Sequence, residues 1–529
     1  MKKYNLTTVF LLLITTLLTA QPPFKTGINF PFRNPETTSL ADYLSRLHES
    51  GTTAMRQMTY ADVYWHQVEP VDDEWDFSHS DSAYFNPYGI TSVGELFSIM
   101  GPNDQTGIQV PWEACSDPNA CYWDPASDSL ATKDYISTVI NRYKDVTSYW
   151  EITNEFEHVL PPEGLPLNAK KDFLQYCYRW VKQADPSAQV LLPGMLGTYG
   201  YPMENTYDWL NTFLDMGGGH TFDIMNYHDY NAWWTLPAHL DSIRAILDNH
   251  GFGETPIWIT ETSISSVNIS PITPDYSSPD EQAADVWRRL SLLWAHGAEV
   301  AFWHSHWSSG DLSGWGEFGL LNSSGQKKKS FYAFQLLMEK VAAFSEIEIL
   351  EEGEITTDND NGGNGIWLIA FTVNDQKKWL IWSPDQTTYL LTGINTPYVL
   401  TTRVVPLSLS DNGEEAVFEK DSLPTTNGSL LIDDLSSLPL LIEETSLSSS
   451  SRLQSVKSLL SIYPNPVHEK LFVKTNRTIS QIEVYNPLGK LCLISKGKII
   501  DTTHWPAGMY YLSILLESGE RKTTRIIKR

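Results

Sequence analysis

The chain has 529 residues, which is too long for a single hydrophobic core and predicts two to four domains. Its formal net charge is −27, yet residues 459–529 hold 11 Lys and Arg against 5 Asp and Glu, so an acidic body carries a basic C-terminal end. The acidic body excludes a nucleic-acid partner, because nucleic-acid binding needs clustered Lys and Arg.

Residues 1–20 have the pattern of a secretory signal peptide. Lys2 and Lys3 form the charged start, residues 9–18 are apolar, and residues 18–20 (LTA) offer a cleavage site. The apolar run is too short to span a bilayer comfortably, and no later stretch predicts a transmembrane segment. Cys115 and Cys121 could close a small disulfide loop, whereas Cys177 and Cys492 are expected to be free.

Strand and helix patterns alternate from residue 27 to residue 343. Strands are predicted at residues 27–30, 54–58, 91–97, 149–153, 189–195, 222–227, 256–260 and 299–304. Helices are predicted at residues 40–50, 133–143, 207–216, 237–250, 281–296 and 329–342, and residues 65–88 are predicted to be mostly loop. This order predicts an α/β fold, a (β/α)8 TIM barrel, whose active site lies at the C-terminal ends of the strands.

Two of these strands end in carboxylates. Asn154 and Glu155 follow the fourth strand, and Glu261 closes the seventh. A polar pair at the end of an apolar strand is either a terminus that meets solvent or a site. Two strands that deliver one carboxylate each to the same rim suit cleavage of a glycosidic bond. Glu151 and Glu157 are weaker candidates, since Glu151 has the opposite strand phase from Ile152.

Other polar or aromatic side chains fall at the ends of further strands. Arg56 lies in the second strand, and His228 and Tyr230 follow the sixth. Trp303 ends the eighth strand together with His304. Each has a structural alternative, and His228 in particular could be a core histidine. Further tryptophans in the strand-end loops, such as residues 233 and 234, could stack on a sugar or simply pack the loop.

These features together resemble a clan A glycoside hydrolase of the family 39 or family 5 type. The motifs that carry the resemblance are the strand-four Asn-Glu pair, the strand-seven Glu, the strand-two Arg, a His-x-Tyr at residues 228–230, the strand-eight Trp, and residues 65–70 (WHQVEP) with 75–78 (WDFS). The resemblance implies a retaining β-glycosidase that needs no metal or organic cofactor. It makes Glu155 the acid/base and Glu261 the nucleophile, and it assigns substrate binding to Arg56, Asn154, His228, Tyr230 and Trp303.

The region after the barrel changes character. Residues 346–445 contain apolar runs separated by Asn, Gly and Asp turns, which predict a small antiparallel β-sandwich. An accessory structural role is the favoured interpretation, and a carbohydrate-binding module is the alternative. Residues 358–365 are predicted to form an exposed, mobile loop, and residues 446–458 a Ser-rich linker.

The last segment, residues 459–529, has the turn residues and alternation of an all-β domain. Its motifs at residues 462–466 (IYPNP), 482–490 (IEVYNPLGK), 505–511 (WPAGMYY) and 525–529 (RIIKR) closely resemble the type A C-terminal sorting domain of the type IX secretion system. That resemblance implies a Bacteroidetes-type bacterium, passage through the periplasm, and secretion or display at the cell surface by the type IX machinery.

The predicted organisation is therefore a signal peptide at 1–20, a catalytic barrel at 21–345, an accessory sandwich at 346–445, a linker at 446–458 and a sorting domain at 459–529. The predicted function is double-displacement hydrolysis of a β-glycosidic bond in a polysaccharide or oligosaccharide. Two alternatives stay open: an exo-acting β-glycosidase on short oligosaccharides, and a non-catalytic carbohydrate-binding surface protein.

Overall fold

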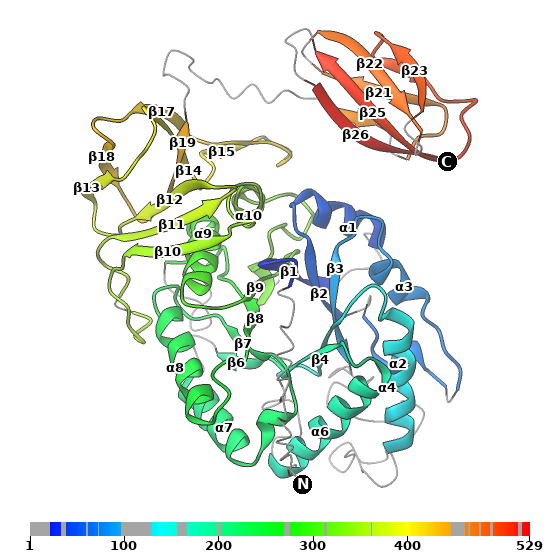
Figure 1. Cartoon of the computed structure of the whole chain (residues 1–529), viewed down its shortest axis with the longest axis vertical. Coiled ribbons are helices and arrows are strands. Elements are labelled where there is room, and N and C mark those ends of the chain that lie inside the picture. The colour runs from blue at the N-terminus through cyan, green and yellow to red at the C-terminus, as the bar shows by residue number, and fades with distance from the viewer. Residues whose placement is uncertain are drawn as a thin grey trace, which may run out of the picture. The chain divides into compact units, whose positions relative to one another are not determined.

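A computed structural model describes residues 22–32, 39–59, 62–71, 73–96, 129–155, 167–197, 203–268, 276–310, 315–360, 362–445, 461–463, 466–475, 478–486, 490–516 and 521–529. The chain forms two compact units, Met1–Ser450 and Ser451–Arg529 (Figure 1). The predicted signal peptide and the predicted Cys115–Cys121 pair lie outside the described residues. Cys177 and Cys492 are free, as predicted.

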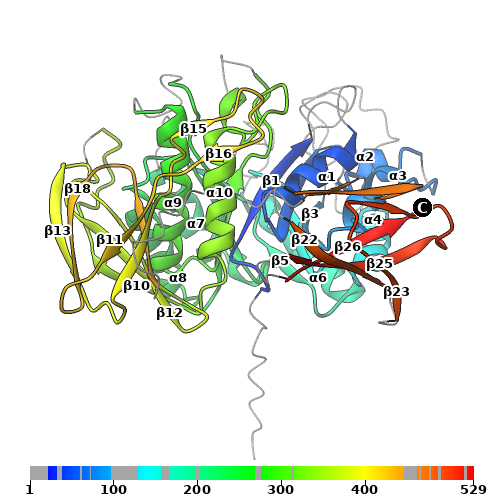
Figure 2. The ribbon, with the colours of Figure 1, turned by 90° about the horizontal axis from the view of Figure 1, so that it is seen from above.

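The first unit is built on a parallel sheet surrounded by helices (Figures 1 and 2). Its strands are β1 (Thr26–Phe32), β2 (Ala54–Thr59), β3 (Thr91–Leu96), β4 (Tyr149–Ile152), β5 (Gln189–Leu191), β6 (Met195–Gly197), β7 (Met225–Asp229), β8 (Ile257–Thr262) and β9 (Val300–His304). Their order in the sheet is β5-β4-β3-β2-β1-β9-β8-β7-β6.

The fifth barrel strand is broken into β5 and β6, where one continuous strand was predicted. Pro193 lies in the break and has no N–H to give to a sheet ladder. β5 pairs with β4 and β6 pairs with β7, and a parallel bridge from Leu191 to Ile224 joins the two edges. The nine strands therefore occupy eight positions of a closed barrel, which confirms the predicted fold class.

Helices follow most of the strands. They are α1 (Leu40–Glu49), α2 (Trp65–Val68), α3 (Ser78–Tyr84), α4 (Ser129–Tyr143), α6 (Leu167–Ala184), α7 (Met203–Asp215), α8 (Leu236–Asn249), α9 (Pro279–Ala295) and α10 (Lys329–Lys340). The short α2 and α3 lie in the segment predicted to be mostly loop, because four and seven residues are too few to display a helical period. The long α6, which contains Cys177, completes the fourth repeat and was not among the helices predicted above.

Side chains inside the barrel form two layers. An apolar layer contains Ala54, Val93, Leu191, Ile224, Trp258, Val300 and Phe302. Because strand side chains alternate, the next inward position on β2 is Arg56 and the next on β7 is Asn226. The barrel interior therefore changes from apolar to polar toward the C-terminal ends of the strands.

The second part of the first unit is antiparallel, as predicted. Its strands are β10 (Glu346–Glu351), β11 (Trp367–Val373), β12 (Gln376–Trp382), β13 (Thr387–Thr392), β14 (Tyr398–Arg403), β15 (Ser408–Leu409), β16 (Ala416–Val417), β17 (Lys420–Pro424), β18 (Ser429–Leu435) and β19 (Leu440–Thr445). A six-stranded sheet, β10-β11-β12-β19-β14-β17, and the β13-β18 pair share an apolar cluster that includes Leu368, Ile381, Leu391 and Ile432.

Residues 358–360 and 362–365 form a loop in which Asp358, Asp360 and Asn364 are exposed, as predicted, but the loop is attached to the barrel. Asn359 accepts a hydrogen bond from the Ala232 N–H at 2.8 Å, and its amide donates to Asn231 at 3.1 Å. The indole N–H of Trp234 donates to the carbonyl of Asp358 at 2.8 Å. The turn residues of this segment do not reveal that its hydrogen-bond partners are residues 231–234 of the barrel. The sequence analysis therefore missed the attachment.

The second unit is an all-β domain. Its strands are β20 (Ser461–Tyr463), β21 (Lys470–Lys474), β22 (Ile479–Tyr485), β23 (Leu491–Ser495), β24 (Ile499–Asp501), β25 (Gly508–Leu516) and β26 (Arg521–Lys528). They form the antiparallel sheets β20-β21-β24 and β23-β22-β25-β26 around one apolar cluster. Across both units, none of the described helices has the length and apolar character needed to cross a bilayer.

Candidate active site

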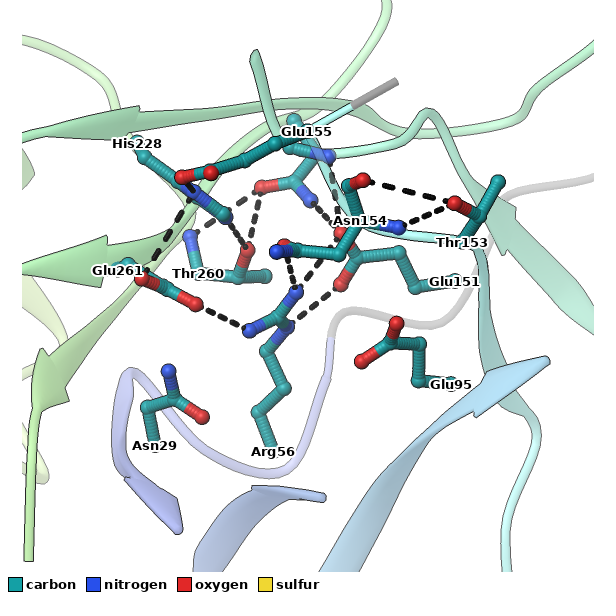
Figure 3. A network of polar contacts seen from close by, with 12 residues as sticks. Asn29, Arg56, Glu95, Glu151, Thr153, Asn154, Glu155, His228, Thr260 and Glu261 are labelled. Carbon is teal, nitrogen blue, oxygen red and sulfur yellow. Dashed lines mark hydrogen bonds and ion pairs between the residues drawn. The ribbon is translucent and has the colours of Figure 1, made fainter. Parts of the chain in front are cut away.

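Arg56 is the centre of the polar layer in the barrel (Figure 3). Its side chain is fully buried and donates to the Glu151 carboxylate from Nε at 2.6 Å and from Nη2 at 3.1 Å. Nη1 donates to Oε1 of Glu261 at 2.6 Å, and Nη2 also donates to Oδ1 of Asn154 at 2.7 Å. Burial acts to lower the pKa of Arg56, but the charges of Glu151 and Glu261 outweigh it and raise the pKa, so the guanidinium stays charged.

Glu261 lies at the end of β8, where the strand register with β7 shifts. Such a bulge re-aims a side chain, and here Thr260 and Glu261 both reach the inner network. Burial favours the neutral acid, but the positive charges of His228, His304 and Arg56 and the hydroxyl of Tyr230, which donates to Oε2, together lower the pKa of Glu261 well below its usual range. Glu261 is therefore held as a carboxylate.

Glu155 faces Glu261 across His228. Nδ1 of His228 lies 3.0 Å from Oε1 of Glu155 and 3.8 Å from Oε2 of Glu261. The side chain of Glu155 is 23% exposed while that of Glu261 is 5% exposed, so the two carboxyls have different access to water. One oxygen of Glu155 and one of Glu261 lie within 4.8 Å of each other.

The hydrogen bonds of His228 favour its charged form. The Thr260 hydroxyl donates to Oδ1 of Asn226 at 2.9 Å, so Nε2 of His228, 3.1 Å from that hydroxyl oxygen, must be the donor between them. Nδ1 faces the carboxyl of Glu155, which accepts. Burial opposes the charge, but Glu261 and Glu155 raise the pKa of His228 above its usual value. The contacts therefore favour a protonated His228 between the two carboxyls when Glu155 is ionised.

The backbone around Asn154 is strained. Thr153 has φ 59° and Glu155 has φ 44°, and a left-handed conformation is costly for a β-branched residue such as Thr153. The Asn154 N–H donates to the Thr153 hydroxyl at 2.6 Å, and the Glu155 N–H donates to the Gly194 carbonyl at 3.0 Å. These bonds hold Asn154 and Glu155 in a conformation that the chain would not adopt by itself, as often occurs at functional sites.

Six of the seven predicted site residues come together. Glu155, Glu261, Arg56, Asn154 and His228 form the connected network just described, and Tyr230 joins it through its hydroxyl. Trp303 does not join it, which corrects its predicted position on the floor of the cleft. Trp303 is fully buried in the apolar cluster between the strands and the surrounding helices. The residue before it, Phe302, belongs to the apolar layer inside the barrel. The next residue, His304, points into the barrel. Its Nδ1 atom lies 3.5 Å from Oε2 of Glu261 and 2.9 Å from Nδ2 of Asn29.

The sequence analysis ranked Glu151 only as a weaker candidate and did not predict the nearby carboxyl of Glu95. Glu151 is fully buried and accepts from Arg56, from the Gly194 N–H at 2.9 Å and from Asn226 at 3.0 Å. Glu95, at the end of β3, is also buried, and burial raises its pKa well above the usual range. The strand phase of Glu151, inward like Arg56, is the signal that could have identified it. Glu157 lies outside the described residues.

One group of side chains in the described part of the chain could hold a metal ion. It consists of Glu155, His228 and Glu261, whose ligand atoms lie within 4.8 Å of one another. These are the groups of the candidate active site itself. A divalent cation bound there would therefore occupy carboxylate and imidazole atoms of the candidate active site.

Each unit of the chain contains a segment that matches the model of a known protein family. Residues 122–298 match the model of a glycosyl hydrolase catalytic core. Residues 461–529 match that of a secretion system C-terminal sorting domain. The first match contains Asn154, Glu155, His228 and Glu261, and the second covers the whole basic unit.

Two characterised enzymes show distant sequence similarity. An endo-1,4-beta-xylanase of Geobacillus stearothermophilus is 24% identical over 192 residues, which are 35% of this chain and 57% of that enzyme. Endo-1,4-beta-xylanase B of Paenibacillus barcinonensis is 22% identical over 254 residues, or 45% and 69% of the two chains. The chain therefore spans little more than half the length of the first relative.

Among solved structures, a family 39 glycoside hydrolase from the gut symbiont Bacteroides cellulosilyticus WH2 superposes with a TM-score of 0.59. The superposition covers 81% of this chain and 82% of the family 39 structure. The sequence identity is 18%, so the likeness concerns the fold. The family models therefore find a glycosyl hydrolase catalytic core in residues 122–298 and a secretion system C-terminal sorting domain in residues 461–529, and the structural likeness shows the fold of the first unit.

Proposed function

We propose that this chain, a glycoside hydrolase core with a sorting domain, is a secreted retaining enzyme that cleaves β-glycosidic bonds in a polysaccharide. The observation that carries the proposal is the pairing of Glu155 and Glu261, with one oxygen of each within 4.8 Å. Carboxyl groups of retaining enzymes lie roughly 5–5.5 Å apart, whereas inverting enzymes need roughly 6.5–9.5 Å to admit a water. The short approach supports direct attack by one of them.

The environments of the two carboxyls support different roles. Glu261 is nearly buried and held ionised, as a nucleophile must be. Glu155 is more exposed and is bound by His228 through Oε1, which can orient Oε2 toward a leaving group. In the proposed first step, Glu261 forms a bond to the anomeric carbon while Glu155 gives its proton to the departing glycosidic oxygen.

The second step releases the sugar. Glu155, now a carboxylate, takes a proton from a water molecule, and the water oxygen attacks the anomeric carbon. The bond to Glu261 breaks, and Glu261 returns to the carboxylate form that Arg56 and Tyr230 stabilise. Two inversions at the same carbon leave the configuration unchanged.

Asn154 is proposed to bind the sugar. Its Oδ1 accepts from Arg56, so its Nδ2 amide hydrogens are directed elsewhere and can donate to a sugar hydroxyl. A hydrogen bond to the 2-hydroxyl strengthens in the transition state and therefore contributes to rate. His304, rather than Trp303, supplies the inward side chain of β9 beside Glu261.

The proposed substrate class is a β-1,4-linked plant polysaccharide, with xylan as the first candidate because both sequence relatives are xylanases. The mature full-length protein should be incubated with arabinoxylan, mixed-linkage glucan and glucomannan, and the products separated by length. Intermediate oligosaccharides indicate internal cleavage, while single sugars alone indicate the exo-acting alternative. Tight binding without any product would favour the non-catalytic alternative.

The two roles can be tested with aryl β-glycosides and azide. Glu261→Ala and Glu155→Ala should each lose activity, by roughly 10²-fold or more, and the exposed Glu254→Gln should not. Azide should restore turnover in both, giving the α-azide without the nucleophile and the β-azide without the acid/base. An α sugar as the first product of the parent enzyme would disprove the retaining mechanism.

A further inference from the structure

A second pocket lies between the barrel and the sandwich and shares no described lining residue with the Glu155–Glu261 site. Its volume is about 530 Å³. Trp233 and Trp234, from the segment after β7, and Tyr276, before α9, supply its aromatic side. Glu281 and Arg288 of α9 and Asn359 of the sandwich supply its polar side. Pockets of this size are large enough for a small ligand.

The pocket is largely preformed. The ring of Trp233 packs edge-on against Trp367 at 5.2 Å and Trp382 at 5.8 Å, two buried rings of the sandwich. The guanidinium of Arg288 lies 5.1 Å from the centre of the Trp233 ring. With the bonds from Asn359 to the barrel, these contacts fix both walls, so a ligand would meet little cost of ordering them.

The chemistry of the walls suits a sugar. Aromatic rings beside amide, carboxylate and guanidinium groups provide apolar contact for the C–H face of a pyranose and partners for its hydroxyls. Nε of Arg288 and the hydroxyl of Tyr276 are buried with no hydrogen-bond partner in the described part of the chain. Both residues line this pocket, but these two atoms lie behind its surface, so a ligand would meet the other atoms of their side chains.

The charges favour a neutral ligand. Arg288 is already paired with Glu281, and Asp360 on the sandwich side adds an exposed carboxylate. The lining therefore has an excess negative charge, which would repel a uronate or a phosphate. A neutral saccharide carries no such penalty.

We propose that this pocket is a secondary saccharide-binding site that holds a neutral segment of the polymeric substrate. The proposal rests on the proposed function in naming the ligand as part of that substrate. Its position beside the segment that follows Tyr230 would keep a bound polymer attached to the catalytic barrel. Such attachment raises the local concentration of the polymer without taking part in bond cleavage.

The test fills the pocket without touching the catalytic network. Ser437 lines it and is partly exposed, so Ser437→Trp places an indole inside it. Thr388→Trp, on an exposed face of the same sandwich, is the matched control. Each full-length variant is measured for kcat/KM on an aryl β-xyloside and for retardation in gels containing arabinoxylan, mixed-linkage glucan or glucomannan.

The expected result is an unchanged aryl β-xyloside rate with roughly tenfold weaker retention on one polymer for Ser437→Trp alone. Equal retention of both variants, or no retention of the parent, would overturn the second site. If Ser437→Trp misfolds, Asp360→Trp decides, since Asp360 is exposed and also lines the pocket: weaker retention supports the site and unchanged retention overturns it. Failure of the proposed function would give a different result. The parent protein would then hydrolyse none of the substrates, while Ser437→Trp would still be retained more weakly than the parent.

Discussion

Gly194 lies directly against the ring of His228: a Cβ atom at Gly194 would be 2.0 Å from Nε2 of His228. The same glycine donates its N–H to Glu151 and accepts from the N–H of Glu155. The break in the fifth strand therefore does more than interrupt a sheet. It places Gly194, which has no side chain, against His228, the histidine between the two candidate catalytic carboxyls.

We expect Gly194→Ala to reduce kcat/KM strongly while leaving a folded protein. The new methyl group must displace His228 or the backbone that holds Glu155, and a displacement of about 1 Å at a catalytic group can cost roughly 10²-fold in rate. Hydrolysis of an aryl β-glycoside measures the effect, and circular dichroism checks the fold. The control is Gly497→Ala, where a Cβ would meet no atom closer than 3.6 Å. Full activity of Gly194→Ala would show that the position of His228 is unimportant.

Tyr230→Phe should move the acidic limb of the kcat/KM profile to higher pH. Glu261 must be ionised to attack, and the Tyr230 hydroxyl helps to lower its pKa. Without that hydrogen bond the pKa of Glu261 rises, so activity is lost at a higher pH as the solution is acidified. Tyr227→Phe is the matched control, because Tyr227 lies on β7, just before Tyr230, and its buried hydroxyl has no hydrogen-bond partner in the described ranges. Identical profiles for both variants would contradict this role of Tyr230.

Glu151→Gln and Glu155→Gln should separate stability from chemistry. Glu151 neutralises the buried Arg56, and removal of one partner from a buried ion pair costs about 3–5 kcal/mol. Glu155 is partly exposed, so its substitution should change the free energy of unfolding far less. Urea denaturation gives both values. Equal stability of the two variants would mean that Glu151 does not support the site as its contacts indicate.

Divalent copper or zinc should inhibit the enzyme, and EDTA alone should not. The ions can bind Glu155, His228 and Glu261, whose ligand atoms are within 4.8 Å, and so compete with the reaction. His228→Asn should weaken the inhibition, measured as the metal concentration that halves residual activity, because it removes the nitrogen ligand. The His250→Asn variant, altered at a histidine outside the group, should be inhibited like the parent. Loss of activity in EDTA would instead indicate a required metal.

The sequence allowed the barrel and most of the site to be predicted because strand ends in such a barrel meet at one rim. Glu155 and Glu261 needed only that rule, together with the resemblance. Trp303 and His304 show its limit. Neighbouring strand residues point to opposite sides, so a change of one position exchanges a core tryptophan for a site histidine.

Contacts between distant segments explain the other omissions. Glu151 joins the site through Arg56, Gly194 and Asn226, which lie 95, 43 and 75 residues away in the chain. Residues 358–365 have the composition of a loop, and only their bonds to Asn231, Ala232 and Trp234 show that they are attached. No local pattern in either segment records its partner.

The attachment of the sandwich to the barrel has a consequence for how such enzymes can diversify. Ala232 and Trp234 follow Tyr230 by only a few residues, and their hydrogen-bond partners belong to the sandwich. A recombination event that exchanged the sandwich for another module would leave these groups without partners close to the catalytic machinery. The two domains should therefore be inherited together, whereas the sorting domain is a compact unit of its own.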